Sequence, residues 1–248
     1  FTIVLDNIHG LEMNVFEYPL KLIPQPVNII ENYREVIQGP YNFTLYYRNS
    51  IKITVITTVL QVIFSAMAGF AFSKLQFIGR KTLFVILVST MMIPEQVLLV
   101  PRFIMSSSMG LYDTHAIIII LLSFSVYGMF LMRQYMVSIP LEMTEAARID
   151  GASYWQQFSR VVLPMSKPIM VTLAILKFVW TWNDYQTPLV FLHSRELYTI
   201  QQGIRQFANE SGAFYSLMMA ACVIAVLPLI LIYLLGQKYI EQGMTAGA

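Results

Sequence analysis

The stretch that decides the fold is SIPLEMTEAARIDGASYWQQFSRVVLPMSKP, residues 138–168, which lies between two strongly apolar blocks. It is the only long run in the second half of the chain that is too polar to lie in lipid. Pro140 suits a helix start, because its fixed φ fits the first helical turn. Gly151 suits the end of that helix, since a left-handed residue is cheap only for glycine. The pattern therefore predicts a helix over 141–149 and then a sharp turn.

A second short helix is predicted after the turn. Ser153 and Gln156 have the spacing of a capping box, which marks a helix start. Pro164 predicts that this helix ends before residue 164. Such a helix-turn-helix, standing out of a membrane, is a docking element. The simpler alternative is an amphipathic loop resting on lipid headgroups, with Trp155 and Phe158 dipping into them.

The composition places the rest of the chain in a membrane. Of 248 residues, 56% are hydrophobic and 12% charged, about half the charged fraction of a globular domain. A net charge of +2 gives no case for nucleic-acid binding. The single cysteine, Cys222, excludes a disulfide framework within the chain, and three scattered histidines form no metal-ligand pattern.

Apolar blocks near 20 residues predict five membrane spans, at about 51–73, 82–105, 116–132, 168–191 and 213–235. The first is about 35 Å long as a helix, enough to cross a bilayer with some tilt. Small residues around Gly69 suit close contact with another helix. The second span is expected to be broken, because Pro94 and Pro101 interrupt it. One short surface helix is expected over 28–37.

The distribution of cations orients these spans. The loop KLQFIGRK, residues 74–81, holds three cations and is expected to be cytoplasmic, as is the loop over 138–164. Residues 1–50 then form an extracytoplasmic segment, followed by a transmembrane domain over 51–248. A chain reaches that outer side only after an earlier crossing, so we expect a sixth span upstream of residue 1.

The spacing within 138–164 matches the EAA loop of ABC importer permeases. Glu145-Ala146-Ala147 is followed by three residues, Gly151, nine residues, Val161, one residue and Leu163-Pro164, with Val161 where isoleucine is usual. Further matching pieces are FIGRK at 77–81, MMIPEQVLLVP at 91–101, GLYDT at 110–114, TWNDY at 181–185 and GMTAGA at 243–248. From about Asn32 onward the chain resembles a carbohydrate-type permease, specifically the second, maltose-type subunit of a heterodimer.

The resemblance implies an all-α integral membrane fold of the type I ABC importer permeases, in a bacterial inner membrane. It implies one permease half of an ATP-driven importer for a sugar or oligosaccharide. The implied partners are a second, unlike permease, two cytoplasmic ATPase subunits and an extracytoplasmic solute-binding protein. Mg-ATP would be bound by the ATPase, so this chain is expected to hold no cofactor and to catalyse no reaction.

The resemblance also assigns residues to ATPase coupling. These are Glu145, Ala146, Ala147, Gly151, Leu163 and Pro164. A carboxylate at 145 can accept a charge-assisted bond from a basic ATPase residue, although it is also typical of a solvated helix face. The tail residues Gly243, Thr245 and Gly247 match an ending that reaches the ATPase in some members of the family. The alternative is a frayed terminus.

Three ionisable residues fall at membrane depth: Glu95, Lys177 and Asp184. Because a charge in a bilayer needs a partner or a wet cavity, they are candidates for the translocation path. Lys177 and Asp184 are seven residues apart, which predicts one shared helix face. Trp182 and Asn183 join them as candidates. The alternative is subunit packing with an aromatic belt.

Two other classes of function compete with import. An integral-membrane enzyme, for example a lipid-linked glycosyl transferase, would use Glu95 or Asp184, but it requires a paired or metal-binding acidic cluster that the sequence does not show. A secondary carrier would show broken helices in two matched halves, whereas only one broken span is predicted here.

Overall fold

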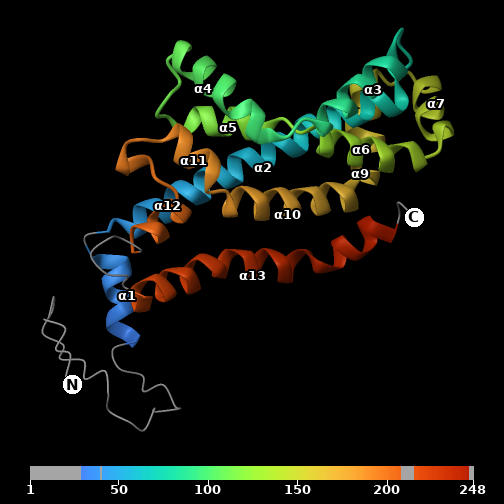
Figure 1. The fold of residues 1–248 in the computed structure, drawn as a ribbon. Helices are drawn as coiled ribbons and strands as arrows, with labels where there is room; N and C mark the ends of the chain where they lie inside the picture. Colours follow the sequence, from blue (N-terminus) through green and yellow to red (C-terminus); the bar gives the residue numbers. More distant parts are fainter. Residues whose placement is uncertain (1–28, 40, 208–214, 246–248) are drawn as a thin grey trace, which may run out of the picture.

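The structure, a computed structural model, describes residues 29–39, 41–207 and 215–245, and the regular elements within these ranges are all helices (Figure 1). The first 28 residues of the expected extracytoplasmic segment lie outside the described residues. The central element is α2 (Phe43–Lys74), a helix of 32 residues that packs against α5, α6 and α10.

The helix α2 begins eight residues before the predicted start at 51, which corrects the sequence-based boundary. Hydropathy missed residues 43–50 because they include polar side chains, yet packing holds them in the helix. Tyr46 is only 2% exposed, and the Thr44 hydroxyl donates to the Ile37 carbonyl of α1 (Ile29–Gln38), 3.0 Å away. The predicted short helix over 28–37 is confirmed by α1.

The predicted break in the second apolar segment is confirmed. This segment consists of α3 (Arg80–Ser89), η1 (Thr90–Met92), η2 (Glu95–Leu98) and α4 (Leu99–Ser108), and its two halves meet at 92°. The bend lies at Ile93 and Pro94. Pro101 does not interrupt the helix, contrary to expectation, because it lies in the first turn of α4, where no intrahelical N–H is required.

A break in the third segment was not predicted. It consists of α5 (His115–Ser123) and α6 (Val126–Ser138), so it also runs six residues beyond the predicted end at 132. Phe124 and Ser125 between them are extended, and the Ser125 hydroxyl accepts from the Gly128 N–H, 3.1 Å away. A side-chain cap of this kind competes with a continuous helix. No proline or glycine stands at Phe124–Ser125 to predict the break from the sequence.

The fourth segment is also divided, which corrects the single span predicted over 168–191. It consists of α10 (Lys167–Asn183) and α11 (Gln186–Phe191), separated at Asp184 and Tyr185. The short elements η4 (Arg195–Leu197) and α12 (Ile200–Gln206) follow. The last helix, α13 (Tyr215–Thr245), contains Pro228 and extends ten residues beyond the predicted end at 235.

Three helical stretches are long and apolar enough to cross a membrane: 43–74, 115–138 and 216–238. Two bent pairs, 80–92 with 95–108 and 154–165 with 167–183, bring the number to as many as five. The assignment of individual crossings stays a prediction.

The close packing predicted around Gly69 is confirmed. A Cβ atom added at Gly69 would lie 2.7 Å from the Cβ atom of Met132 in α6, closer than two such atoms approach in practice. Met132 is fully buried, together with Phe70 of α2 and Leu173 of α10. The absence of a side chain at Gly69 therefore lets α2 and α6 pack closely beside the loop over 138–164.

Candidate functional site

The first helix of the predicted helix-turn-helix is α7 (Leu141–Ile149), and it ends as the sequence predicts. Gly151 adopts a left-handed conformation, with φ +80°. The Ala152 N–H donates to the Ala147 carbonyl at 2.9 Å, and the Gly151 N–H donates to the Arg148 carbonyl at 3.0 Å. These two bonds form a Schellman motif, which satisfies carbonyls at the helix end and fixes the turn.

The second half consists of α8 (Tyr154–Gln156), a π-helical turn η3 (Gln157–Val162) and α9 (Leu163–Met165). The predicted capping box is confirmed, because the Ser153 N–H donates to Gln156 Oε1 at 2.8 Å and the Gln156 N–H donates to the Ser153 hydroxyl. The helix does not end before Pro164, contrary to expectation. The wide turn of η3 ends at Val162, so Pro164 lies in the first turn of α9, where proline is tolerated.

Buried contacts attach the helix-turn-helix to the membrane helices. The Phe158 ring is 6% exposed and lies 5.3 Å from the ring of Phe70 in α2. The Lys74 ammonium, at the end of α2, donates to the Ile139 carbonyl just before α7. Phe158 is therefore a core residue rather than a headgroup or partner contact.

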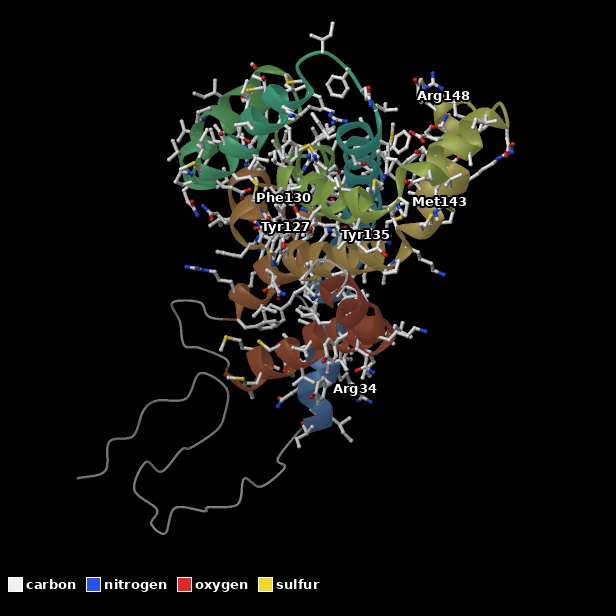
Figure 2. All side chains as sticks on the ribbon, turned by 90° about the vertical axis from the view of Figure 1, so that its right-hand side faces the viewer. Arg34, Tyr127, Phe130, Tyr135, Met143 and Arg148 are labelled. Atoms are coloured by element: carbon white, nitrogen blue, oxygen red, sulfur yellow. The ribbon has the colours of Figure 1, made fainter. Side chains whose placement is uncertain are left out.

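The opposite face of the helix-turn-helix is exposed. Figure 2 shows α7, with Met143 and Arg148, projecting from the body of the molecule. Ile149 is 87% and Trp155 63% exposed, and Leu141, Met143 and Tyr154 are also exposed. An apolar surface of this kind marks an interaction site. Among the predicted coupling residues, Glu145, Ala146, Gly151 and Pro164 are exposed, and Ala147 and Leu163 are half-buried.

The candidate path residues Glu95, Lys177 and Asp184 come from different elements. Asp184 does not share a helix face with Lys177, because α10 ends at Asn183 and Asp184 continues in an extended conformation. Asp184 Oδ1 instead accepts from the Thr187 N–H at 3.0 Å and so caps α11. Lys177 is 8% exposed, and the acidic side chains that act electrostatically on it are Asp184 and then Glu95. Glu95 itself is exposed at the start of η2.

The two other path candidates differ in exposure. Trp182 is only 1% exposed, and its indole N–H donates to the Ala225 carbonyl at 2.9 Å. Asn183 is exposed, and its Nδ2 donates back to the Val179 carbonyl. Trp182 therefore packs inside this chain, and only Asn183 presents a polar side chain to the surroundings.

The tail candidates lie at the limit of the described residues. Gly243 and Thr245 belong to the last turn of α13, and their side chains are not described. Gly247 lies outside the described residues.

Two polar contacts at the other end of the molecule were not predicted. Asn49 Nδ2 donates to the carbonyls of Glu196 and Tyr198, at 2.8 and 3.0 Å. Asp113 accepts from the backbone N–H groups of His193 and Ser194. In each contact the two partners lie about 80 to 150 residues apart, so local patterns do not reveal the pairing. The only sequence signal was a polar pair, Asn49-Ser50, directly before an apolar run.

A bundle of apolar helices with bent spans and a projecting helix-turn-helix defines an integral membrane permease of the ABC importer class. More particularly, the chain belongs to the family described as "Binding-protein-dependent transport system inner membrane component", whose pattern matches residues 61–246. This membership places the chain in the inner membrane.

Named relatives agree with this assignment. The chain is 31% identical to the "Arabinooligosaccharides transport system permease protein AraQ" of Bacillus subtilis (strain 168), over 91% of this chain and 80% of that protein. It is 34% identical to the "Melibiose/raffinose/stachyose import permease protein MelC" of the same organism, over 81% and 74%. A chain of a bacterial ABC transporter "involved in the import of the acidic polysaccharide alginate" matches with a TM-score of 0.80 and 27% identity, covering 90% of this chain and 83% of that chain.

Proposed function

We propose that this chain is one permease half of an ATP-driven importer for a sugar or oligosaccharide, and that the helix-turn-helix over 138–164 couples it to a cytoplasmic ATPase. The observation that carries this proposal is the two-sided construction of the helix-turn-helix. Its inner side is fixed to α2 through Phe158, whereas Ile149, Trp155 and Glu145 are exposed.

Each coupling residue has a physical task in this proposal. Glu145 receives a basic group of the ATPase, and the small side chains of Ala146 and Ala147 let a groove of the ATPase approach α7 closely. Gly151 holds the turn, while Leu163 and Pro164 begin α9, the last helical turn of the element. A rigid element is required, because a loose contact cannot pass motion between subunits.

The sugar assignment rests on the relatives, whose names state arabinooligosaccharides or melibiose, raffinose and stachyose as their cargo. The partner permease is proposed to be an unlike chain, and an extracytoplasmic binding protein is proposed to deliver the sugar. Mg-ATP is bound by the ATPase in this scheme, so the chain itself carries out no chemical reaction.

The translocation path is proposed to involve Glu95, Lys177, Asn183 and Asp184. Lys177 is the buried charge of this group, and the two carboxylates that act on it come from different elements, η2 and the junction of α10 with α11. Trp182 is left out because it is buried against α13. The tail, Gly243 to Gly247, is proposed as a further ATPase contact.

Ala147→Arg tests the coupling role, because a long cation at this half-buried position fills the space that the ATPase groove needs. We expect the variant to reach the membrane at the parent level but to lose ATPase in a pull-down, together with import in reconstituted vesicles. Ile78→Arg is the matched control, since Ile78 is fully exposed on a different loop of the same predicted side. Normal ATPase binding and import in Ala147→Arg would refute the coupling role.

A further inference from the structure

The helix α2 connects the two ends of the molecule without interruption. Its 32 residues correspond to about 48 Å at 1.5 Å per residue. Among the described residues, the segment over 80–108 is bent by 92° and the one over 154–183 by 76°. The segment over 115–138 is divided at Phe124–Ser125, and α10 is divided from α11 at Asp184–Tyr185. Within the ranges that the structure describes, α13 is the one other long helix without a break, and its main contacts are with α1, α10 and α12 rather than with the helix-turn-helix.

The outer end of α2 holds the segment 195–207 through that segment's backbone. Asn49 Nδ2 donates to the carbonyls of Glu196 and Tyr198, and the Ser50 hydroxyl accepts from the Ile200 N–H at 2.8 Å. Asn49 and Ser50 are 6% and 3% exposed. The bonds are shielded and go to backbone groups of segment 195–207, so they do not depend on the side chains of that segment.

The inner end of α2 holds the helix-turn-helix. The rings of Phe70 and Phe158 lie 5.3 Å apart, and both side chains are buried. Lys74 donates to the carbonyl of Ile139, directly before α7. One unbroken helix is thus attached at one end to 195–207 and at the other to the element that we assign to ATPase docking.

We propose that α2 is a rigid strut that transmits displacement between segment 195–207 and the helix-turn-helix, and that Asn49 is the positioning residue that fastens the outer end. A helix without proline, packed along one face against α5, α6 and α10, resists both stretching and bending. The bent segments absorb displacement at their breaks instead. This inference rests on the proposed coupling function and adds the route by which an event at the outer face reaches the ATPase.

Asn49→Leu tests the strut, because leucine keeps the branching and the number of side-chain heavy atoms and removes both N–H donors. The complete importer is reconstituted with its ATPase and binding protein, and ATP hydrolysis is measured against binding-protein concentration. We expect ATPase pull-down and basal hydrolysis at parent levels, with the maximal stimulated rate reduced toward the basal rate. The binding-protein concentration that gives half of the maximal effect should stay unchanged. Ser50→Ala should act in the same direction.

Thr57→Val is the matched control. Thr57 is fully buried on the same helix, but its hydroxyl has no hydrogen-bond partner among the described residues, so the substitution breaks no attachment that the structure shows. We expect it to keep the parent maximal rate. If Asn49→Leu does not accumulate in the membrane, Ser50→Ala is judged by the same criteria.

Three results would overturn the strut. The first is that Asn49→Leu keeps the full maximal rate of stimulated ATP hydrolysis. The second is that Asn49→Leu reaches this full rate only at a higher binding-protein concentration. The third is that Thr57→Val loses as much of the maximal rate as Asn49→Leu does. The second would mean that Asn49 only shapes a docking surface. Each of these results leaves the proposed ATPase docking untouched, because that proposal depends on the separate outcome of Ala147→Arg.

Discussion

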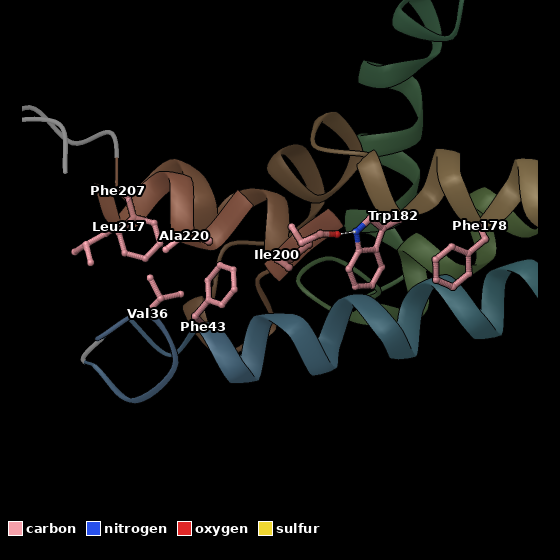
Figure 3. Packing of buried hydrophobic residues seen from close by; sticks show 10 residues of the cluster. Val36, Phe43, Phe178, Trp182, Ile200, Phe207, Leu217 and Ala220 are labelled. Atoms are coloured by element: carbon pink, nitrogen blue, oxygen red, sulfur yellow. Dashed lines mark hydrogen bonds between the residues drawn. The ribbon is translucent and has the colours of Figure 1, made fainter. Parts of the chain in front are cut away.

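The indole N–H of Trp182 in α10 donates a hydrogen bond to the backbone carbonyl of Ala225 in α13, 2.9 Å away (Figure 3). Trp182 is 1% exposed and stacks on Phe178, with ring centroids 5.8 Å apart. Pro228, three residues after Ala225, has no N–H, so this part of α13 already lacks one helical bond. The Trp182 bond therefore fastens α13 to the bundle next to an intrinsically weak turn.

Trp182→Phe should lower the free energy of unfolding by about 1 to 3 kcal/mol, because the buried Ala225 carbonyl loses its indole donor. Trp182→Ala should cost about 3 to 5 kcal/mol through the cavity that it leaves. Thermal unfolding of the purified complex measures both. Because we assign Trp182 to packing, the assembled Trp182→Phe variant should import sugar near the parent rate. Reduced import at normal stability would indicate that Trp182 belongs to the translocation path.

Gly151→Val should disrupt the turn between the two helices of the helix-turn-helix that we propose to couple to the ATPase. A side chain at φ +80° costs about 1 to 2 kcal/mol, and more when it is β-branched. We expect normal membrane levels but loss of ATPase in a pull-down. Gly110→Val is the matched control, since Gly110 also has a positive φ and open space around it but lies in the turn after α4. Equal loss of ATPase binding in both variants would contradict a specific role for Gly151.

Asp184→Asn separates charge from capping. Asparagine can still accept the Thr187 N–H bond that starts α11, but it no longer acts electrostatically on Lys177. We expect assembly at the parent level and a reduced rate of import into vesicles. A variant that assembles and transports at the parent rate would show that the Asp184 charge is not part of the path.

Asp113 should contribute stability that depends on pH. The Ser194 side chain, then the backbone N–H groups of Ser194 and His193, donate to the Asp113 carboxylate and hold its pKa below the usual 3.8. A lowered folded-state pKa means that the contribution is complete above the unfolded value and disappears as pH falls through the folded value.

The stability of Asp113→Asn should consequently be lower than that of the parent at about pH 7, by less than about 1 kcal/mol because the carboxylate is partly exposed. The difference should narrow as the pH falls below about 4. Thermal unfolding of both proteins across this range gives the result. A difference that stays constant down to about pH 3 would mean that the charge of Asp113 plays no part.

The orientation of the chain predicts opposite accessibility for two exposed isoleucines. Ile30 in α1 is 78% exposed, and Ile78 in the loop before α3 is fully exposed. In a Cys222→Ala background, Ile30→Cys should react with an impermeant thiol reagent from outside the membrane, whereas Ile78→Cys should react only after the membrane is opened. Labelling of both from outside would exclude the proposed topology.

Local rules were enough to predict the helix-turn-helix. Pro140, Gly151 and the Ser153–Gln156 pair act on backbone groups within a few residues, so their geometry follows from the sequence and is found in the structure. The bend near Pro94 and the close approach at Gly69 were predictable for the same reason. Proline removes a donor and glycine removes a side chain wherever they occur.

The tertiary structure alone decided which polar groups are satisfied by distant partners. Groups that lie tens to more than a hundred residues away decide three features of the fold. They decide whether residues 43–50 continue α2, whether Trp182 faces α13 and whether Asn49 holds segment 195–207. A buried polar group must find a partner, but the sequence does not state which one. For this protein, sequence determined the helix-turn-helix and the apolar segments, whereas packing between distant segments determined how they are joined.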